Sequence, residues 1–372
     1  MESFVFYGTT FVEKSHVEPH SCSYENGNND TALLTPRNAS ISTDNCTYTG
    51  TINIGHETLS VEPCNPNRHI RDFFIDTPEN LTCCHILTQM NVTKLDEEPD
   101  DSKFYPNKTY APYLSNITDR NIPYGGDKVI TYTVFFYYTP QFAAVTPDIM
   151  GWIEDVIADT NEGYNNSMIP LKAKYFCHRQ IQIQEQDVSG YTVLDKFENL
   201  GEAMGRGDGA TNLRGSADIA VLLVVEFELC GKAYGIGSIA EGKALCVVKK
   251  SCAIAQHSFG HEIAHLMGAN HNHDPTADST TTPYPWASGH LIASGPNDVG
   301  LRTIMSYSKD GHEKRVNYYS NPNVIHPITG TPTGLLGISN VALLITQAAP
   351  TEFLSHLGDE SGTCDPTPSM CH

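Results

Sequence analysis

Hydrophobic positions between residues 128 and 267 alternate between the spacing typical of strands and that typical of helices. Three runs rich in β-branched and aromatic residues predict strands: residues 128–139, 171–183 and 217–227. Two segments with apolar side chains at helical spacing predict helices, residues 147–164 and 193–204, and a third helix is expected over residues 255–267. Because strands and helices follow one another in turn, the pattern favours an α/β sheet.

The first 122 residues differ in character from the rest of the chain. They are polar and rich in Thr, Asn and Pro, with short strand-like runs at residues 50–54 and 58–61. An acidic stretch then leads into a Pro/Tyr/Asn segment, which reads as a linker or as a solvated loop. We therefore expect three parts: a β-rich N-terminal region over residues 1–122, a main domain over residues 127–358, and a short cysteine-containing tail over residues 359–372.

Amino-acid composition and net charge limit both the class of protein and the kinds of partner. The chain has 372 residues, of which 40% are hydrophobic and 18% charged, as expected for a globular protein with room for two domains. A formal net charge of −20 argues against nucleic acid and anionic membrane surfaces as partners. The longest apolar run, residues 219–225, is too short to span a bilayer and predicts a buried strand.

Cysteine usage and glycosylation sequons indicate the secretory route. The chain has 11 cysteines, and eight asparagines stand in Asn-x-Ser/Thr sequons: Asn29, Asn38, Asn45, Asn80, Asn91, Asn107, Asn116 and Asn165. The start of the chain has neither the basic residues nor the apolar core of a signal peptide. We expect a secreted, extracellular glycoprotein whose leader is missing here. A cytosolic protein with reduced thiols is the alternative.

The string HEIAHLMGANH at residues 261–271 carries most of the predicted chemistry. On a helix, His261 and His265 lie one turn apart on the same face, so both imidazoles can reach one metal ion. Gly268 can end the helix and turn the chain so that His271 arrives as third ligand. Glu262 can take a proton from water at the metal. Histidines of an ordinary amphipathic helix would not require the glycine and the third histidine at this spacing.

This motif resembles that of the metzincin clan of zinc endopeptidases. A second mark of the clan follows at residues 302–307, Arg-Thr-Ile-Met-Ser-Tyr, which is similar to the Met-turn. The resemblance implies that Met305 forms an apolar floor under three imidazoles without binding the metal. An ordinary core methionine is the alternative.

Within the clan, the chain resembles the reprolysin-like (adamalysin-type) metallopeptidases over about residues 127–357. The similar segments are residues 132–140, 217–224, 230–234, 251–253, 318–322 and 340–350. The resemblance implies an α/β (α+β) metzincin-type catalytic domain with a mixed, mostly parallel twisted sheet and an active-site helix. The N-terminal region resembles the propeptide of the same group more weakly, at residues 50–55 and 69–70.

Two positions depart from the reprolysin pattern. Reprolysins usually place Asp directly after the third histidine, but this chain has Asn272, followed by His273. His273 is thus a rival third ligand, although the Gly-x-x-His spacing favours His271. The Met-turn also ends in Tyr307, as in astacins and serralysins, where the tyrosine binds zinc or stabilises the oxyanion. In this chain Tyr307 has either that role or a plain packing role.

The resemblance implies a secreted zinc-dependent endopeptidase with protein or peptide substrates, one catalytic zinc ion and Glu262 as general base. Nothing in the sequence indicates calcium. An edge strand near residues 234–239 would pair with extended substrate, and pocket residues are expected around residues 284–290 and after Met305. The gluzincin alternative needs a downstream glutamate ligand, and no glutamate occurs between Glu262 and Glu313.

An odd number of cysteines lies where a propeptide would be. A thiolate from Cys83 or Cys84 could fill the fourth zinc position and keep the enzyme latent as a zymogen; the alternative is that both form ordinary disulfides. In the main domain we expect Cys230 to pair with Cys252, which leaves Cys177 with Cys246, although sequence alone does not fix the connectivity.

The triplet Arg206-Gly207-Asp208 suggests integrin binding, but the flanking glycines favour a turn after a helix. It defines the main rival hypothesis, a secreted binding or adhesion module on a metzincin scaffold with weak catalysis. Inactive relatives would be expected to lose the general base or a ligand histidine. Glu262 and the three histidines are all present, which favours the enzyme.

Overall fold

The computed structural model describes two parts of the chain. It describes the backbone of eight strands between residues 3 and 90. It also describes residues 129–185, 192–204, 209–272, 284, 286–292, 300–308 and 313–352. The chain divides into two compact units, one of Met1–Leu95 with Thr146–Asp159 and one of Asp96–Val145 with Thr160–His372.

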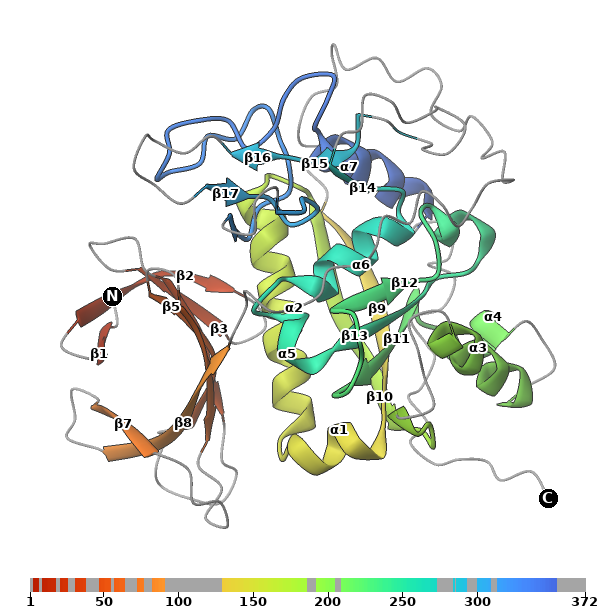
Figure 1. Cartoon of the computed structure of the whole chain (residues 1–372), viewed down its shortest axis with the longest axis horizontal. Helices are drawn as coiled ribbons and strands as arrows, with labels where there is room; N and C mark the ends of the chain where they lie inside the picture. Colours follow the sequence, from red (N-terminus) through yellow and green to blue (C-terminus); the bar gives the residue numbers. More distant parts are fainter. Residues whose placement is uncertain are drawn as a thin grey trace. The chain divides into compact units, whose positions relative to one another are not determined.

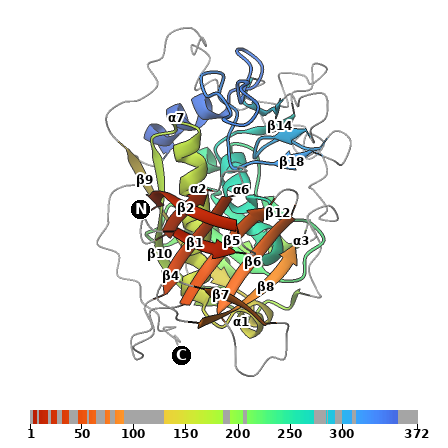
Figure 2. The ribbon, with the colours of Figure 1, turned by 90° about the vertical axis from the view of Figure 1, so that its left-hand side faces the viewer.

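The N-terminal unit contains a closed sheet of eight antiparallel strands (Figure 2). The strands are β1 (Ser3–Phe6), β2 (Thr9–Val17), β3 (Ser21–Glu25), β4 (Thr31–Arg37), β5 (Thr47–Ile54), β6 (Glu57–Pro63), β7 (Asp72–Asp76) and β8 (Thr82–Met90). They follow the order β1-β2-β3-β4-β5-β6-β8-β7, and Val5 of β1 pairs with Asp76 of β7 to close the sheet. The two strands predicted from residues 50–54 and 58–61 are confirmed as β5 and β6.

The second unit is built on a five-stranded sheet in the order β10-β9-β11-β13-β12. Its strands are β9 (Ile130–Tyr138), β10 (Leu171–Gln180), β11 (Ile219–Val224), β12 (Gly231–Ala233) and β13 (Leu245–Lys249). The first four in this order are parallel, and only β12, at one edge, is antiparallel to its neighbour. Every residue of β11 is buried, as expected for a central parallel strand covered on both faces.

Helices cover both faces of this sheet. On one face, α3 (Thr192–Met204) and α4 (Gly209–Arg214) pack over an apolar cluster that includes Phe135, Phe197 and Leu222. On the other face, the Phe259 ring of α6 (Ser258–Leu266) stacks on Phe136 at 5.5 Å between ring centroids. Figure 1 shows α3 and α6 on opposite sides of the strands. The sheet thus fixes the position of α6, the helix that carries the histidine motif.

A group of buried tyrosines links the sheet to the same helix. The hydroxyl groups of Tyr132 and Tyr164 lie 2.9 Å apart, and the Tyr164 ring stacks on Tyr319. The Tyr319 hydroxyl donates a hydrogen bond of 3.0 Å to the carbonyl oxygen of Gly260, next to the first histidine. Because all three rings are buried, this contact is shielded from water and holds the start of α6 in place.

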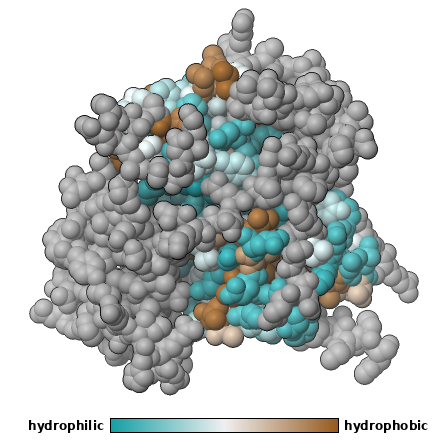
Figure 3. Space-filling view, viewed as in Figure 1, coloured by the Kyte–Doolittle hydropathy of each residue, from teal (hydrophilic) through white to brown (hydrophobic). Residues whose placement is uncertain are grey.

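The remaining elements are short, apart from two helices. They are α1 (Pro140–Val145), α2 (Ile149–Asn166), η4 (Ser238–Glu241), α5 (Lys250–Ala253), β14 (Asn270–Asn272), β15 (Ser288–Gly289), β16 (Leu291–Ile292), β17 (Leu301–Arg302), β18 (Lys314–Arg315) and α7 (Val341–Glu352). No described helix has the length and apolar character needed to cross a membrane. On the face drawn in Figure 3, the described surface is mostly hydrophilic, with separate hydrophobic patches.

The strands and helices predicted between residues 128 and 267 are confirmed as β9, α2, β10, α3, β11 and α6, most of them a few residues shorter than the pattern suggested. The edge strand expected over residues 234–239 is wrong. The strand is β12, Gly231–Ala233, and it ends before Gly237, which adopts a left-handed conformation (φ 74°). A residue in that conformation cannot continue a strand, and the chain turns there into η4.

Candidate metal centre

Two of the predicted ligands lie on α6, which runs from Ser258 to Leu266. His261 and His265 are one turn apart and both are buried, at 3% and 0% exposed. Because residues four apart lie on the same face of a helix, their rings face the same point. The helix therefore presents two imidazoles to one position inside the protein.

A turn at Gly268 brings the third histidine to these two. Gly268 has φ 111°, a backbone conformation that residues with a side chain rarely adopt, and its N–H donates to the His265 carbonyl oxygen. A side chain at this position would also lie 3.0 Å from the Tyr284 ring. The chain then enters β14, where His271 is buried at 8% exposed. Gly268 thus ends the helix in the manner expected from the motif.

The three imidazoles converge through the same ring nitrogen. The Nε2 atom of His265 lies 3.0 Å from that of His261 and 2.8 Å from that of His271, and the remaining pair is 3.2 Å apart. Among the described residues, these three form a group whose donor atoms could share one metal ion. The donor set suits zinc, which takes three histidines and leaves one position for water in catalytic sites.

Backbone carbonyls orient two of the rings. The Nδ1 atom of His261 lies 2.9 Å from the Ile304 oxygen, and the Nδ1 atom of His265 lies 2.8 Å from the Ala269 oxygen. A carbonyl oxygen only accepts, so each Nδ1 must carry the proton and donate it. Each Nε2 then has its lone pair directed to the shared point, as a metal ligand requires.

The surroundings keep these rings neutral. Burial lowers the pKa of His261 and of His271 well below the usual range, and both pKa values are lowered further because a proton added to either ring would be repelled by a protonated His265 and by Arg315. A protonated imidazole has no lone pair for a metal, so the depressed pKa keeps the ligands ready across the neutral range.

Glu262 follows the first ligand directly and is buried, at 1% exposed. Its carboxylate lies against the first residue of the edge strand β12, because an atom added at Gly231 would contact it. The glutamate therefore lies between the histidine-bearing helix and the edge strand, with little access to bulk water.

The predicted Met-turn lies directly against the histidines. Met305 is fully buried, and Ile304 before it supplies the carbonyl oxygen that orients His261. The Ser306 N–H donates to the Thr303 oxygen at 2.9 Å and closes the turn. The Tyr307 ring lies over the His271 ring, with 3.9 Å between centroids and an angle of 30°.

Asn272, the residue that departs from the reprolysin pattern, joins the third ligand to the Met-turn. Its Oδ1 accepts hydrogen bonds of 2.8 Å from the Tyr307 N–H and from the Ser306 hydroxyl. Its Nδ2 donates to the Tyr307 oxygen at 3.3 Å. A carboxylate at this position could also accept the first two hydrogen bonds. It could not replace the third, because a carboxylate has no N–H to donate. His273 lies outside the described residues.

A family model described as metallo-peptidase family M12 matches residues 130–320, more than half of the chain, and this span contains every residue of the centre described above. The chain belongs to this family. Membership confirms the resemblance to zinc metallopeptidases of the metzincin type, and with it the predicted catalytic-domain fold.

Several relatives of this M12 chain are named peptidyl-Asp metalloendopeptidase. That of Stenotrophomonas maltophilia is 34% identical over 197 residues, covering 52% of this chain and 45% of the relative. The relative from Xanthomonas campestris is 27% identical over 259 residues, which cover 67% of this chain and 57% of the relative. The relative from Pseudomonas fragi is 40% identical over 77 residues, which cover 21% of this chain and 49% of the relative. The chain spans about half the length of these relatives.

One solved structure, described as a chaperone-substrate complex, is similar over 61% of this chain and 36% of the solved chain. Its identity is 18% and its TM-score 0.46, a likeness too low to carry an argument.

Two buried arginines support the Met-turn of the M12 domain; the sequence motif includes Arg302 but predicted a role for neither arginine. Arg302 of β17 and Arg315 of β18 are strand neighbours, at 5% and 7% exposed. Both donate to the Ser306 oxygen, at 2.7 and 3.3 Å, and both bind Gln256 at the approach to α6, at 3.3 and 3.0 Å. They thus tie the Met-turn to the histidine helix, and their positive charges contribute to the lowered pKa of His261.

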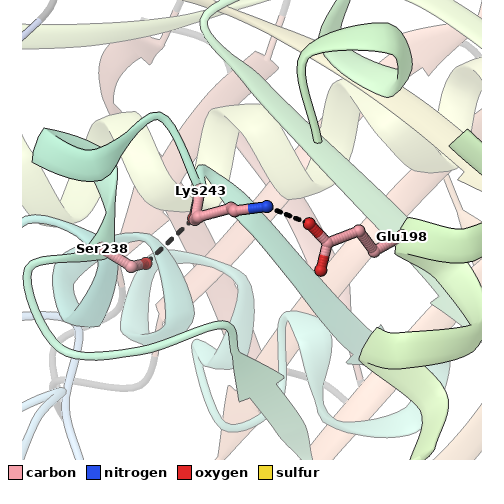
Figure 4. A network of polar contacts seen from close by, with 3 residues as sticks. All are labelled: Glu198, Ser238 and Lys243. Carbon is pink, nitrogen blue, oxygen red and sulfur yellow. Dashed lines mark hydrogen bonds and ion pairs between the residues drawn. The ribbon is translucent and has the colours of Figure 1, made fainter. Parts of the chain in front are cut away.

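The segment after β12 is fixed at both ends of its turn. Lys243 forms an ion pair with Glu198 of α3, and the Ser238 hydroxyl donates to the Lys243 carbonyl oxygen at 2.9 Å (Figure 4). The Gly237 N–H donates to the His265 oxygen at 2.8 Å. The edge of the sheet is therefore attached both to α3 and to the end of the histidine helix.

The disulfide arrangement differs in part from the one expected. Cys230 and Cys252 form a disulfide between the start of β12 and α5. The expected pairing of Cys177 with Cys246 is wrong, because Cys246 is a buried, reduced cysteine whereas Cys177 is part of another disulfide. Cys177 lies on β10 and Cys246 on β13, and because β9 and β11 separate these strands in the sheet, the two cysteines are too far apart for a disulfide.

Other predicted residues lie outside the described side chains. Cys83 and Cys84 fall on β8, of which only the backbone is described, and the triplet at residues 206–208 and the tail are not described. Seven of the eight sequon asparagines are not described either; the eighth, Asn165 at the end of α2, is exposed, as an acceptor for a sugar must be.

Proposed function

We propose that this M12 protein is a zinc-dependent endopeptidase that hydrolyses peptide bonds in proteins. The observation that carries the proposal is the convergence of three buried Nε2 atoms within 3.2 Å of one another, beside a buried glutamate. The relatives named metalloendopeptidases support it.

His261, His265 and His271 would hold the metal. When bound, zinc lowers the pKa of water and polarises the scissile carbonyl. Glu262 accepts a proton from the attacking water and delivers it to the leaving nitrogen. Its burial against β12 keeps competing solvent away from the carboxylate. The hydroxyl of Tyr307, whose ring lies over His271, would donate to the oxyanion as it forms.

The substrate would lie along β12. This strand is at the edge of the sheet and is antiparallel to β13, so an extended peptide can add to it through backbone hydrogen bonds. Such pairing reads an extended shape more than a sequence. It places the scissile bond near Glu262, which contacts the same strand.

For substrate preference, we propose peptide bonds next to aspartate. The relatives carry peptidyl-Asp in their names. In this chain Arg315 and Lys232, both buried, contribute positive charge at His271, and Arg302 contributes it at His261. A positive field around the centre would attract a substrate carboxylate, because Coulomb attraction strengthens in a poorly solvated site.

The deciding experiment for the activity uses the purified protein and a protein substrate, with and without a zinc chelator. We expect cleavage that stops on chelation and returns with added zinc. Glu262→Gln should keep zinc and fold but lose most turnover, on the order of 10²-fold or more. Full turnover by this variant would refute the proposed mechanism.

Substrate preference is tested separately with peptides that differ only by Asp or Asn at one position. We expect a higher kcat/KM for the Asp peptide, and the difference should shrink as salt concentration rises. Equal values for the two peptides would refute the aspartate preference while leaving the peptidase activity intact.

We also propose that the protein is a secreted glycoprotein made as a zymogen, with residues 1–122 as its propeptide-like region. The sequons, the exposed Asn165 and the Cys230–Cys252 disulfide support secretion. A thiolate from Cys83 or Cys84 remains the proposed source of latency. The adhesion alternative rests on residues 206–208, which lie outside the described residues.

A further inference from the structure

The first residue of the edge strand lies in direct contact with the glutamate of the metal centre. A methyl carbon added at Gly231 would lie 2.7 Å from both Cγ and Cδ of Glu262, and closer still to Oε1. Real side-chain carbons essentially never approach other atoms so closely. The carboxylate of Glu262 therefore occupies the space that any side chain at Gly231 would need.

Gly231 has little freedom to move away. Cys230, the residue before it, is joined by a disulfide to Cys252. The Cys230 carbonyl oxygen also accepts a hydrogen bond of 2.9 Å from the Lys249 N–H. In the sheet itself, Gly231 pairs with Val248 of β13. A covalent link and two backbone contacts thus fix the strand at this residue, so an added methyl group would displace the glutamate side chain.

We propose that Gly231 is a positioning residue: the absence of a side chain there sets where the Glu262 carboxylate lies. The proposal rests on the proposed role of Glu262 as general base. A general base must be within hydrogen-bond reach of the proton that it removes, and a misplacement of about 1 Å costs on the order of 10²-fold in rate. The strand that would receive the substrate therefore also fixes the base that acts on it.

The displacement should affect catalysis more than folding. Glu262 reaches Gly231 with the flexible end of its side chain, which can rotate to another position without moving α6. His261 and His265, by contrast, are oriented by the carbonyls of Ile304 and Ala269, not by β12. The ligands should therefore keep their geometry when the glutamate moves.

The first test is Gly231→Ala. We expect kcat to fall on the order of 10²-fold, with KM, bound zinc per chain and Tm close to wild type. The matched control is Gly300→Ala, in which the added methyl also meets a glutamate, 2.8 Å from Cγ of Glu313. It should leave kcat unchanged. Wild-type kcat in Gly231→Ala, with fold and zinc intact, would overturn the proposal.

A double-mutant cycle separates positioning from general damage to the strand. In a Glu262→Gln background the base is already lost, so adding Gly231→Ala should lower the residual kcat less than twofold. An equal, 10²-fold fall in both backgrounds would mean that Gly231 acts independently of Glu262 and would overturn the inference. Full activity of Glu262→Gln alone would refute the proposed function instead, so the two failures are distinguishable.

Discussion

Asn272 and Tyr307 are paired through two hydrogen bonds: the Tyr307 N–H donates to Oδ1 of Asn272 at 2.8 Å, and Nδ2 of Asn272 donates back to the Tyr307 oxygen at 3.3 Å. This pairing joins the strand that carries the third histidine to the turn that carries the buried methionine. Both segments follow α6, but the residues between them include a long stretch outside the described part of the chain. The amide thus fixes His271 relative to the other two ligands.

We predict that Asn272→Asp changes zinc affinity less than tenfold, because the carboxylate still accepts from the Tyr307 N–H and the Ser306 hydroxyl. Asn272→Ala removes all three contacts and should destabilise the fold by about 1 kcal/mol, because hydrogen bonds of an exposed side chain contribute only a small net free energy. Zinc titration and thermal unfolding of both variants measure this. Similar zinc affinities and Tm values for the two would show that the pairing does not hold the centre together.

The choice between His271 and His273 as third ligand can be tested directly. His271→Gln should bind less than one tenth of the zinc of the wild type at equal free zinc, because a three-histidine site loses one ligand. His273→Ala should bind zinc normally, because the three Nε2 atoms that converge belong to the other histidines. Metal analysis after dialysis gives the readout, and the reverse pattern would make His273 the ligand.

Removal of the Tyr307 hydroxyl separates its chemistry from its packing. Tyr307→Phe keeps a ring over His271, so zinc binding should be unchanged, while kcat should fall about 10–10³-fold if the hydroxyl donates to the oxyanion. Steady-state kinetics on one peptide substrate suffice. An unchanged kcat would assign the tyrosine a packing role alone.

The Cys230–Cys252 disulfide should contribute to stability and to activity. Replacing both cysteines by serine should lower the free energy of unfolding by about 2–4 kcal/mol, because the unfolded chain loses a closed loop. It should also lower kcat, because the start of β12 is then fixed only by hydrogen bonds. Chemical denaturation and kinetics at 25 °C measure the two effects. Stability equal to wild type would contradict the first expectation.

Much of the catalytic domain could be predicted from local patterns. A buried parallel strand such as β11 is a continuous apolar run, and the ligand helix α6 carries its histidines at helical spacing, so both are visible in the sequence alone. The edge strand was misplaced because β12 is only three residues long and is defined by pairing with β13, not by its own composition.

The rest of the site depends on contacts between residues distant in the sequence. Nothing local to Arg302 or Arg315 shows that both would bind the Ser306 oxygen, because this requires two strands to come side by side. The contact of Gly231 with Glu262 likewise follows from the packing of the edge strand on α6. The pairing of Cys177 with Cys246 failed for the same reason, since connectivity is set by the fold.

The buried thiol of Cys246 can report whether the sheet of the second unit has opened. Its side chain is 0% exposed in β13, the strand next to the edge strand β12, so alkylating reagents should not modify it while the sheet is closed. Once the sheet opens, the thiol becomes accessible, and its thiolate can also attack the native disulfides. Cys246 itself should therefore resist mild oxidants in the native molecule, whereas in heat-denatured chains its thiolate should start disulfide exchange unless it is blocked first.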